Sequence, residues 1–256
     1  MIQAILFMEA SMTREATVVT DLSNREFLER FAAAGRIGLS GGVTLVDKAI
    51  CRAERHLDEQ EAWSHWSHAF LFQGRRADGH HWVIESDLQI HRKHIHLGVQ
   101  ENRISKYFDE RLYTTLAVLD LGLTEAQAAT LVCAGLELVA NRARYSVREL
   151  FGTLIALRRP ELRGRNNLLA RQSSLYCSAL VHHLFRKAGL DLAPGVHLKN
   201  TTPEDIARMA LPHTAYVLRR EASPGRLTRL KAQLRLKVGA RLRHLKQRNK
   251  RSHRQV

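Results

Sequence analysis

Cys177 is the residue of this chain whose type and position most favour a reactive side chain. It lies in the segment Ser173–Gly189, whose apolar residues recur at helical spacing, so the segment predicts one helix with the cysteine in its first turn. Ser173 or Ser174 is expected to cap the start of this helix, and Gly189 to end it in a left-handed conformation. A thiol at a helix N-terminus faces unpaired N–H groups, which favour the thiolate. Without a base nearby, such a cysteine is simply a small core residue.

A hairpin earlier in the chain supplies a candidate base. Two short β-type runs, 67–72 and 81–86, flank a polar turn that contains two glycines. If Phe72 pairs with His81, the register places His68 opposite Glu85, with about 5 Å between their Cβ atoms. The expected arrangement therefore has a histidine and a carboxylate on one face of the sheet.

The residue types define the chemistry of this arrangement. His68 is expected to accept the proton of Cys177 through one ring nitrogen, while Glu85 holds the other nitrogen and supports the imidazolium. His65 is the alternative base, although on a strand it would point to the opposite face. The backbone N–H of Cys177 is the natural donor to an oxyanion. Candidate side-chain donors are Tyr176, Tyr145 and Gln172.

These motifs resemble a known family. Ser67-His68 before an apolar strand, Ile84-Glu85 on the next strand and Tyr176-Cys177-Ser178 at a late helix resemble the circularly permuted, YiiX/YebB-like branch of the NlpC-type papain-like superfamily. The resemblance covers about residues 37–218. It implies a papain-like fold in which Cys177 is the nucleophile, His68 the base and Glu85 the third member.

The chain departs from the family pattern in two places. The segment Gly38–Gly41 stands where the family has a Gly-Asp pair, and Ala179 stands where it often has an acid. Both departures leave the substrate open. The sequence thus predicts a cysteine hydrolase or acyltransferase, needing no cofactor, that acts on an amide or (thio)ester of a small-molecule, peptide or lipid acyl substrate. The alternative is a non-catalytic papain-like binding module that docks through a basic tail.

The remaining patterns predict an α+β fold, a small antiparallel sheet packed against helices. Expected helices cover 13–36, 43–55, 124–140, 144–150 and 202–207; expected strands add 113–121 and 213–218; turns or loops cover 39–42, 158–171 and 192–199.

The positive charge is concentrated at the end of the chain. Residues 219–256 hold 14 Lys and Arg and one acid, for +13, so the rest of the chain carries only +2 of the total of +15. Leucines recur there every three or four residues, which predicts a basic amphipathic helix. The chain is therefore expected to have a leader, 1–36, a hydrolase domain, 37–218, and this tail, 219–256.

The tail bears on partners and location. Residues 225–247 are suited to an anionic membrane surface; nucleic acid is the weaker expectation, because the tail has no aromatic side chain to stack on bases. The N-terminus lacks the basic start and apolar core of a signal peptide. Three scattered cysteines fit a reducing compartment. We therefore expect a cytoplasmic protein, with peripheral membrane attachment as the open alternative.

A second group of histidines raises the question of a metal. His91, His94 and His96 lie close together, with His80 and His81 nearby. Arg92 and Lys93 separate them, and no cysteine or carboxylate is spaced to complete a known metal signature. The interpretation is a solvated loop without a metal.

Overall fold

The computed structural model describes residues 15–57, 62–91, 94–141, 153, 156–165 and 176–219. They all belong to one unit, Met1–Arg220, while a second unit, Glu221–Val256, lies outside the described residues. The predicted helix at 144–150 and the basic tail at 225–247 are also outside them, as are Tyr145, Gln172 and both expected cap serines. Within the described part, no helix combines the length and apolar character needed to cross a bilayer.

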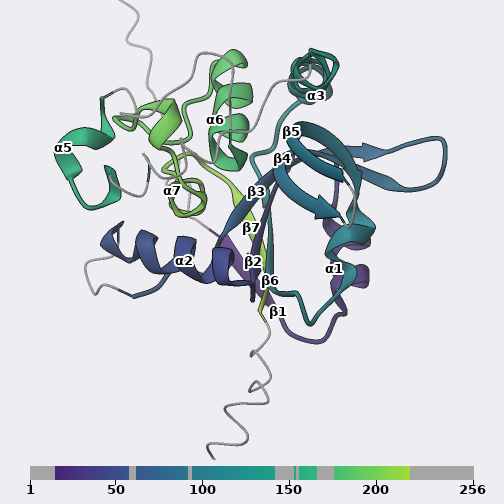
Figure 1. Cartoon of the computed structure of the whole chain (residues 1–256). Coiled ribbons are helices and arrows are strands. Elements are labelled where there is room, and N and C mark those ends of the chain that lie inside the picture. The colour runs from purple at the N-terminus through teal and green to yellow at the C-terminus, as the bar shows by residue number, and fades with distance from the viewer. Residues whose placement is uncertain are drawn as a thin grey trace, which may run out of the picture. The chain divides into compact units, whose positions relative to one another are not determined.

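A mixed seven-stranded sheet forms the centre of the fold (Figure 1). Its strand order is β1-β7-β6-β2-β3-β4-β5. Every neighbouring pair is antiparallel except β1 and β7, which are parallel. The α+β class is confirmed, although the sheet is larger than expected and not purely antiparallel. The strands are β1 Glu15–Val19, β2 Ile37–Gly42, β3 His68–Arg75, β4 His81–His91, β5 His94–Arg103, β6 Tyr113–Asp120 and β7 Thr214–Arg219.

Helices cover both faces of this sheet, and each face has its own core. One core joins α3 and α6 to Leu71 and Ile84; the other joins α1 to Phe70 and Phe72. Alternate residues of β3 thus point to opposite faces, as the period of a strand requires. The helices are α1 Asn24–Phe31, α2 Leu45–Glu54, α3 Glu125–Ala140, α5 Pro160–Arg163, α6 Cys177–Lys187 and α7 Pro203–Ala207, and 3-10 turns cover Arg55–Leu57, Ile104–Phe108 and Leu198–Asn200.

The predicted turn at 39–42 is wrong, because these residues end the central strand β2. Its glycines, taken as turn signals, serve close packing instead. A Cβ on Gly38 would lie 2.0 Å from the Phe70 ring, and a Cβ on Gly41 would lie 2.0 Å from the carbonyl oxygen of His65. The glycine at 41 therefore lets the segment that leads into His68 pass against the sheet.

The leader is also part of the fold. Residues 13–36 were expected to form one helix, but they contain β1, which pairs with β7, and then α1 with its capping box at Ser23. Phe27 and Leu28 of α1 are completely buried. The predicted boundary at residue 36 is therefore wrong, because strand β1 and helix α1 contribute to the sheet and its core.

Several other predictions agree with the structure. Helix α3 begins after the Thr124 cap and ends at Ala140, and α7 follows the Thr202 cap, each with a complete capping box. Strands β6 and β7 lie where they were expected. The loop predicted over 158–171 is interrupted by the short helix α5, which begins at Pro160.

The predicted hairpin forms, but with a different register. Phe72 pairs with Val83 and His81 pairs with Arg75, with an irregularity between Phe72 and Gly74. At Phe72 the register thus differs by two residues from the expected one. Because side chains alternate along a strand, a shift of two leaves each residue on its predicted face.

The histidine-rich run is not a loop. His91 ends β4 and His94 begins β5, and the two strands pair from Trp82–Arg103 to His91–His94. The side chains of 88–97 lie outside the described part. Among the residues it does describe, no group of three or more His, Cys, Asp or Glu is arranged to hold a metal ion.

Candidate active site

Three elements bring the predicted site residues together. His68 is the first residue of β3, Glu85 lies in β4, and Cys177 is the first residue of α6. Nε2 of His68 lies 2.7 Å from Oε2 of Glu85, and the thiol of Cys177 lies within hydrogen-bonding reach of the His68 side chain. Since Glu85 occupies Nε2, Nδ1 is the ring nitrogen left for the sulfur. The cysteine, the imidazole and the carboxylate therefore form one unbroken series of contacts.

The two-residue change in register does not separate His68 from Glu85. Leu71 pairs with Ile84, so continuing the ladder places His68 level with Asp87 and diagonal to Glu85 on the same face. Diagonal neighbours on one sheet face are about 7–8 Å apart at Cα, a distance that long side chains can bridge.

The carboxylate of Glu85 is completely buried and has four partners. Oε2 contacts His68 and accepts a hydrogen bond from the hydroxyl of Tyr107. Oε1 accepts from Nδ2 of Asn102 at 2.6 Å and from Nζ of Lys106 at 2.7 Å. Burial raises the pKa of Glu85, but the Lys106 charge and the His68 hydrogen bond outweigh burial and hold the pKa far below its ordinary value. Glu85 is therefore an anion in contact with the His68 imidazole.

The imidazole and the thiol stabilise each other as an ion pair. Burial alone lowers the pKa of His68, but the charge of Cys177 and hydrogen bonds with Cys177 and Glu85 raise it to about 10. Burial raises the pKa of Cys177, yet the charge and hydrogen bond of His68, followed by the N–H groups of Ala69 and Ser178, lower it below the ordinary value. Both directions favour a thiolate beside an imidazolium.

The start of α6 leaves its backbone donors available to the sulfur. The N-cap is Tyr176, not Ser173 or Ser174, and it makes no side-chain cap hydrogen bond. The first N–H groups of a helix have no partner within the helix, so a missing cap leaves them for a sulfur or a ligand. At the other end, Gly189 has the predicted left-handed conformation, with φ of +80°.

The start of α6 is fixed by hydrogen bonds to one carbonyl. The hydroxyls of Tyr176 and Ser178 donate to the Thr201 carbonyl at 2.7 and 2.8 Å. His182, buried on the same helix, contacts Oγ1 of Thr201 at 2.6 Å and Oδ1 of Asp191 at 2.8 Å. These contacts hold the cysteine in place. They also engage the Tyr176 hydroxyl, so it is not a free donor to a substrate.

A small cavity borders Cys177. Its lining includes Glu54, Ser67, Thr153 and Thr202. Glu54 is 1% exposed, and its Oε2 has no hydrogen-bond partner among the described residues. Burial, and then the charge of Glu204, raises the pKa of Glu54 well above its ordinary value, although a hydrogen bond with Ser64 lowers it, so this environment favours the protonated carboxyl. A protonated carboxyl next to a nucleophile is a hydrogen-bond donor.

The structure places the alternative base elsewhere. His65 is exposed, and the charges that act on it are those of Arg219 and Glu204, with burial as the largest influence lowering its pKa. The backbone carbonyl of His65 packs closely against Gly41 of β2. His68 is therefore the histidine that meets Cys177.

Sequence reasoning missed Asn102, Lys106, Tyr107 and Glu54. The first three lie on or just after β5, a strand that was not predicted. Glu54 lies three residues after the buried Cys51, on the inner side of α2. Its helical spacing from an apolar position is the sequence signal that could have identified Glu54 as a buried acid.

Comparisons with known proteins add a distant likeness of fold. No protein-family model matches the chain, and no curated protein matches it. Among solved structures, the chain is similar to one described as the metalloprotein YiiX from Escherichia coli O157:H7. The identity is 12% and the TM-score 0.47, over 72% of this chain and 96% of the other.

Proposed function

We propose that this chain is a cysteine-dependent acyl-transfer enzyme, a hydrolase or acyltransferase acting on an amide or (thio)ester. The observation that carries the proposal is the continuous contact from Cys177 through His68 to the buried Glu85. A thiolate, an imidazolium and an orienting anion are the components that nucleophilic catalysis at a carbonyl requires. The resemblance of the motifs to the permuted papain-like branch points to the same chemistry.

In the proposed reaction, the sulfur of Cys177 attacks the substrate carbonyl carbon and forms a C–S bond. The resulting oxyanion collapses, the bond to the leaving group breaks, and the leaving group takes the proton of the His68 imidazolium. Water or another acceptor then gives its proton to neutral His68 and attacks the thioester, which releases the acyl group and the thiol. Glu85 stays ionised throughout and keeps the ring oriented.

A direct experiment mixes the full-length protein with p-nitrophenyl acetate. The proposal predicts a burst of p-nitrophenolate close to one equivalent per chain and an acetyl group on the peptide that contains Cys177. Acetylation spread over surface lysines, with Cys177 unmodified, would contradict it.

Glu54 is our candidate for the side-chain donor to the oxyanion. Glu54 lines the same small cavity as Cys177, and burial raises the pKa of its carboxyl, which favours the protonated form. A buried neutral acid can stabilise a developing oxyanion as a preorganised donor, a contribution worth about 10²–10³ in rate. Its other oxygen, Oε1, accepts a hydrogen bond from the backbone N–H of Glu204 at 3.4 Å, which holds the carboxyl at the start of α7.

The prediction for Glu54 uses two reagents that differ in mechanism. Glu54→Leu should slow acetylation of Cys177 by p-nitrophenyl acetate about 10²-fold, because that step forms an oxyanion. It should change alkylation by iodoacetamide less than about twofold, since a displacement at carbon forms no oxyanion. Glu54→Gln, which keeps an N–H donor, should recover most of the acetylation rate.

The two reagents also separate the possible causes of a loss. An equal decrease in acetylation and alkylation would mean that Glu54 supports the cysteine–histidine pair, and would reject the oxyanion role. The pH profile gives a second criterion: the wild-type acetylation rate should decline where Glu54 ionises, and that decline should be absent in Glu54→Gln.

A further inference from the structure

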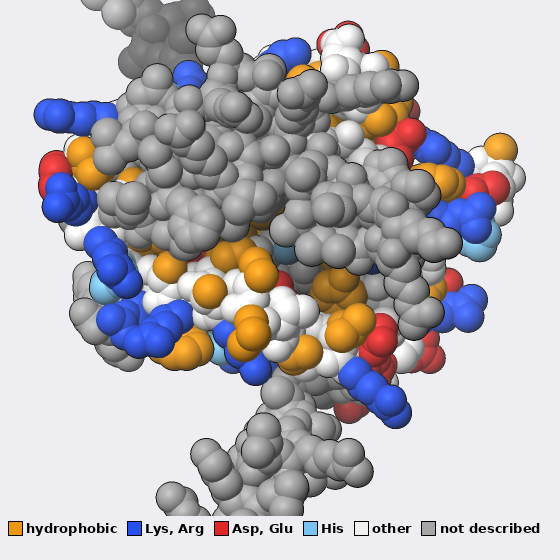
Figure 2. Space-filling model, viewed as in Figure 1, with side chains coloured by type: hydrophobic (Ala, Val, Ile, Leu, Met, Phe, Trp, Pro, Cys, Tyr) orange, Lys and Arg blue, Asp and Glu red, His pale blue; other side chains and the backbone are white. Residues whose placement is uncertain are grey.

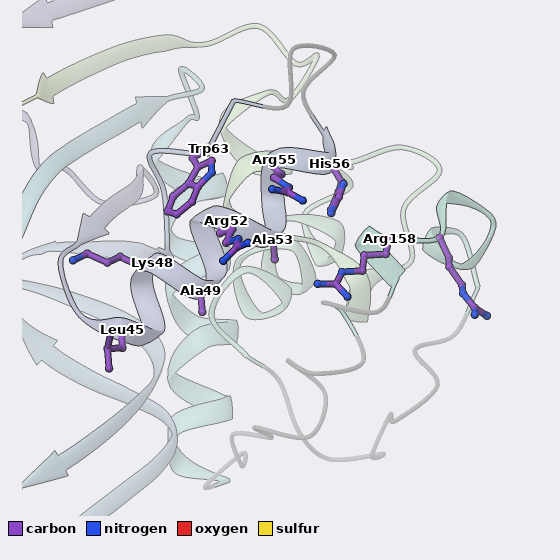
Figure 3. A pocket seen from close by; sticks show the side chains of 10 residues that line it. Leu45, Lys48, Ala49, Arg52, Ala53, Arg55, His56, Trp63 and Arg158 are labelled. Atoms are coloured by element: carbon purple, nitrogen blue, oxygen red, sulfur yellow. The ribbon is translucent and has the colours of Figure 1, made fainter.

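The outer side of α2 borders a cationic cavity that the proposed reaction does not use. The cavity measures about 900 Å³ (Figure 3). Its lining contains six basic side chains: Lys48, Arg52, Arg55, His56, Arg158 and Arg159. The first four come from α2 and the turn after it, and Arg158 reaches toward them from the segment before α5 (Figure 3). None of the described residues that line the cavity is acidic.

The helical period of α2 separates this cavity from the candidate active site. Leu45, Ala49, Arg52 and His56 follow each other at three- or four-residue intervals and form the outer face. Glu54 projects from the buried side of the same helix. The cavity is therefore a second site, and a ligand could bind there whether or not Cys177 is a nucleophile.

The arginines and the lysine of the cavity are not neutralised within the described part of the chain. None of the five forms an ion pair there, whereas Arg36, Arg163 and Arg208 elsewhere each pair with a carboxylate. In addition, Nε of Arg55 is buried and has no hydrogen-bond partner in the described part of the chain. Several cations around one hollow, without an ion-pair partner among the described residues, favour a multiply charged anion.

Apolar surface lies at the edge of this charge. The side chains of Leu45 and Trp63 are 86% and 51% exposed, and the Arg52 guanidinium lies 5.9 Å from the centre of the Trp63 ring. Large apolar side chains exposed beside basic ones are visible on this face of the molecule (Figure 2). A ligand with an anionic group and an attached apolar or planar part would bury both kinds of surface.

We propose that this cavity binds a small phosphate-bearing ligand, held by Arg52, Arg55 and Arg158. Guanidinium groups bind phosphate oxygens through paired N–H donors, and Arg is the preferred residue for this geometry. A concave cavity of this size suits a small ligand or a single lipid headgroup rather than the extended backbone of a nucleic acid. The phosphate could belong to a soluble ester or to a phospholipid, and the shared chemistry is the same.

The test compares two double variants of the full-length chain by titration calorimetry with pyrophosphate at low salt. Arg52→Ala/Arg158→Ala removes two positive charges from the cavity. Arg111→Ala/Lys187→Ala removes two from exposed positions outside it. The wild type should bind pyrophosphate saturably, the cavity variant at least about tenfold more weakly, and the matched control within about twofold of wild type.

Two results would overturn the proposal: no saturable binding by the wild type, or equal weakening in both double variants. A parallel sedimentation with phosphatidylglycerol and phosphatidylcholine vesicles identifies the source of the phosphate. Weaker binding of the cavity variant than of the control to phosphatidylglycerol would assign a lipid headgroup, and an effect limited to pyrophosphate would assign a soluble ester. All variants retain residues 221–256, so the charge of the tail is constant.

Discussion

Replacing Cys177 by serine should abolish formation of the acyl-enzyme with p-nitrophenyl acetate and lower its turnover by about 10³-fold or more. The hydroxyl of serine is a far weaker acid than the thiol, so the environment that lowers the cysteine pKa will not ionise it. The variant should keep its fold, because the side chain is small and the start of α6 is held through Tyr176 and Ser178. The measurement is the burst of p-nitrophenolate together with the mass of the intact protein.

The other two cysteines are matched controls. Cys51 is buried, its thiol donates to the carbonyl of Trp66, and burial is the largest influence that raises its pKa to about 12. Cys133 is exposed on α3. Serine at either position should leave the acyl-enzyme intact. If the burst persists in Cys177→Ser and disappears in Cys133→Ser, the nucleophile has been assigned to the wrong residue.

The second large effect is expected for Glu85→Gln. The amide cannot support an imidazolium, so the pKa of His68 should decrease and that of Cys177 should increase. We expect the rate of acyl-enzyme formation at neutral pH to decrease by roughly 10²–10⁴-fold. Lys106 would also lose one of its two carboxylate partners while it keeps Asp87, which should cost about 2 kcal/mol of unfolding free energy.

The stability effect of Glu85→Gln has a defined pH dependence. The pKa of Glu85 in the folded protein lies below that in the unfolded chain, so the ionised carboxylate contributes stability that is fully present above about pH 4.5 and is lost as the pH falls. Urea unfolding of wild type and variant should therefore differ most near neutral pH, and the difference should narrow in acid. A difference that is constant with pH would mean that the loss arises from packing alone.

The sequence predicted the positions of Cys177, His68 and Glu85 in the fold better than it predicted the residues around them. Cys177 at the start of a helix, and His68 and Glu85 on adjacent strands, could be found because period-two and helical patterns fix which face a residue occupies. The exact register could not be found, since the irregularity between Phe72 and Gly74 depends on packing across the sheet. The register error of two residues did not affect the predicted site, because a shift of two leaves His68 and Glu85 on the same face of the sheet.

The partners of Glu85 could not be predicted, for a different reason. Lys106 and Tyr107 follow β5, whose polar, histidine-rich beginning has no apolar alternation and resembles a loop. The glycines at 38 and 41 imitate a turn because their true role, contact with Phe70 and with the carbonyl of His65, depends on neighbours distant in sequence. Long-range packing, and not local propensity, decides both features.

The central claim is that His68 keeps Cys177 ionised, and the most direct test is the rate of Cys177 alkylation by iodoacetamide against pH, followed by mass spectrometry. The lowered pKa of Cys177 predicts a wild-type rate that stays high well below pH 8.5, the ordinary value for a free thiol. His68→Ala should move the midpoint to about pH 8.5 or above and lower the rate at pH 7 accordingly. Superimposable profiles for the two proteins would contradict the cysteine–histidine pair.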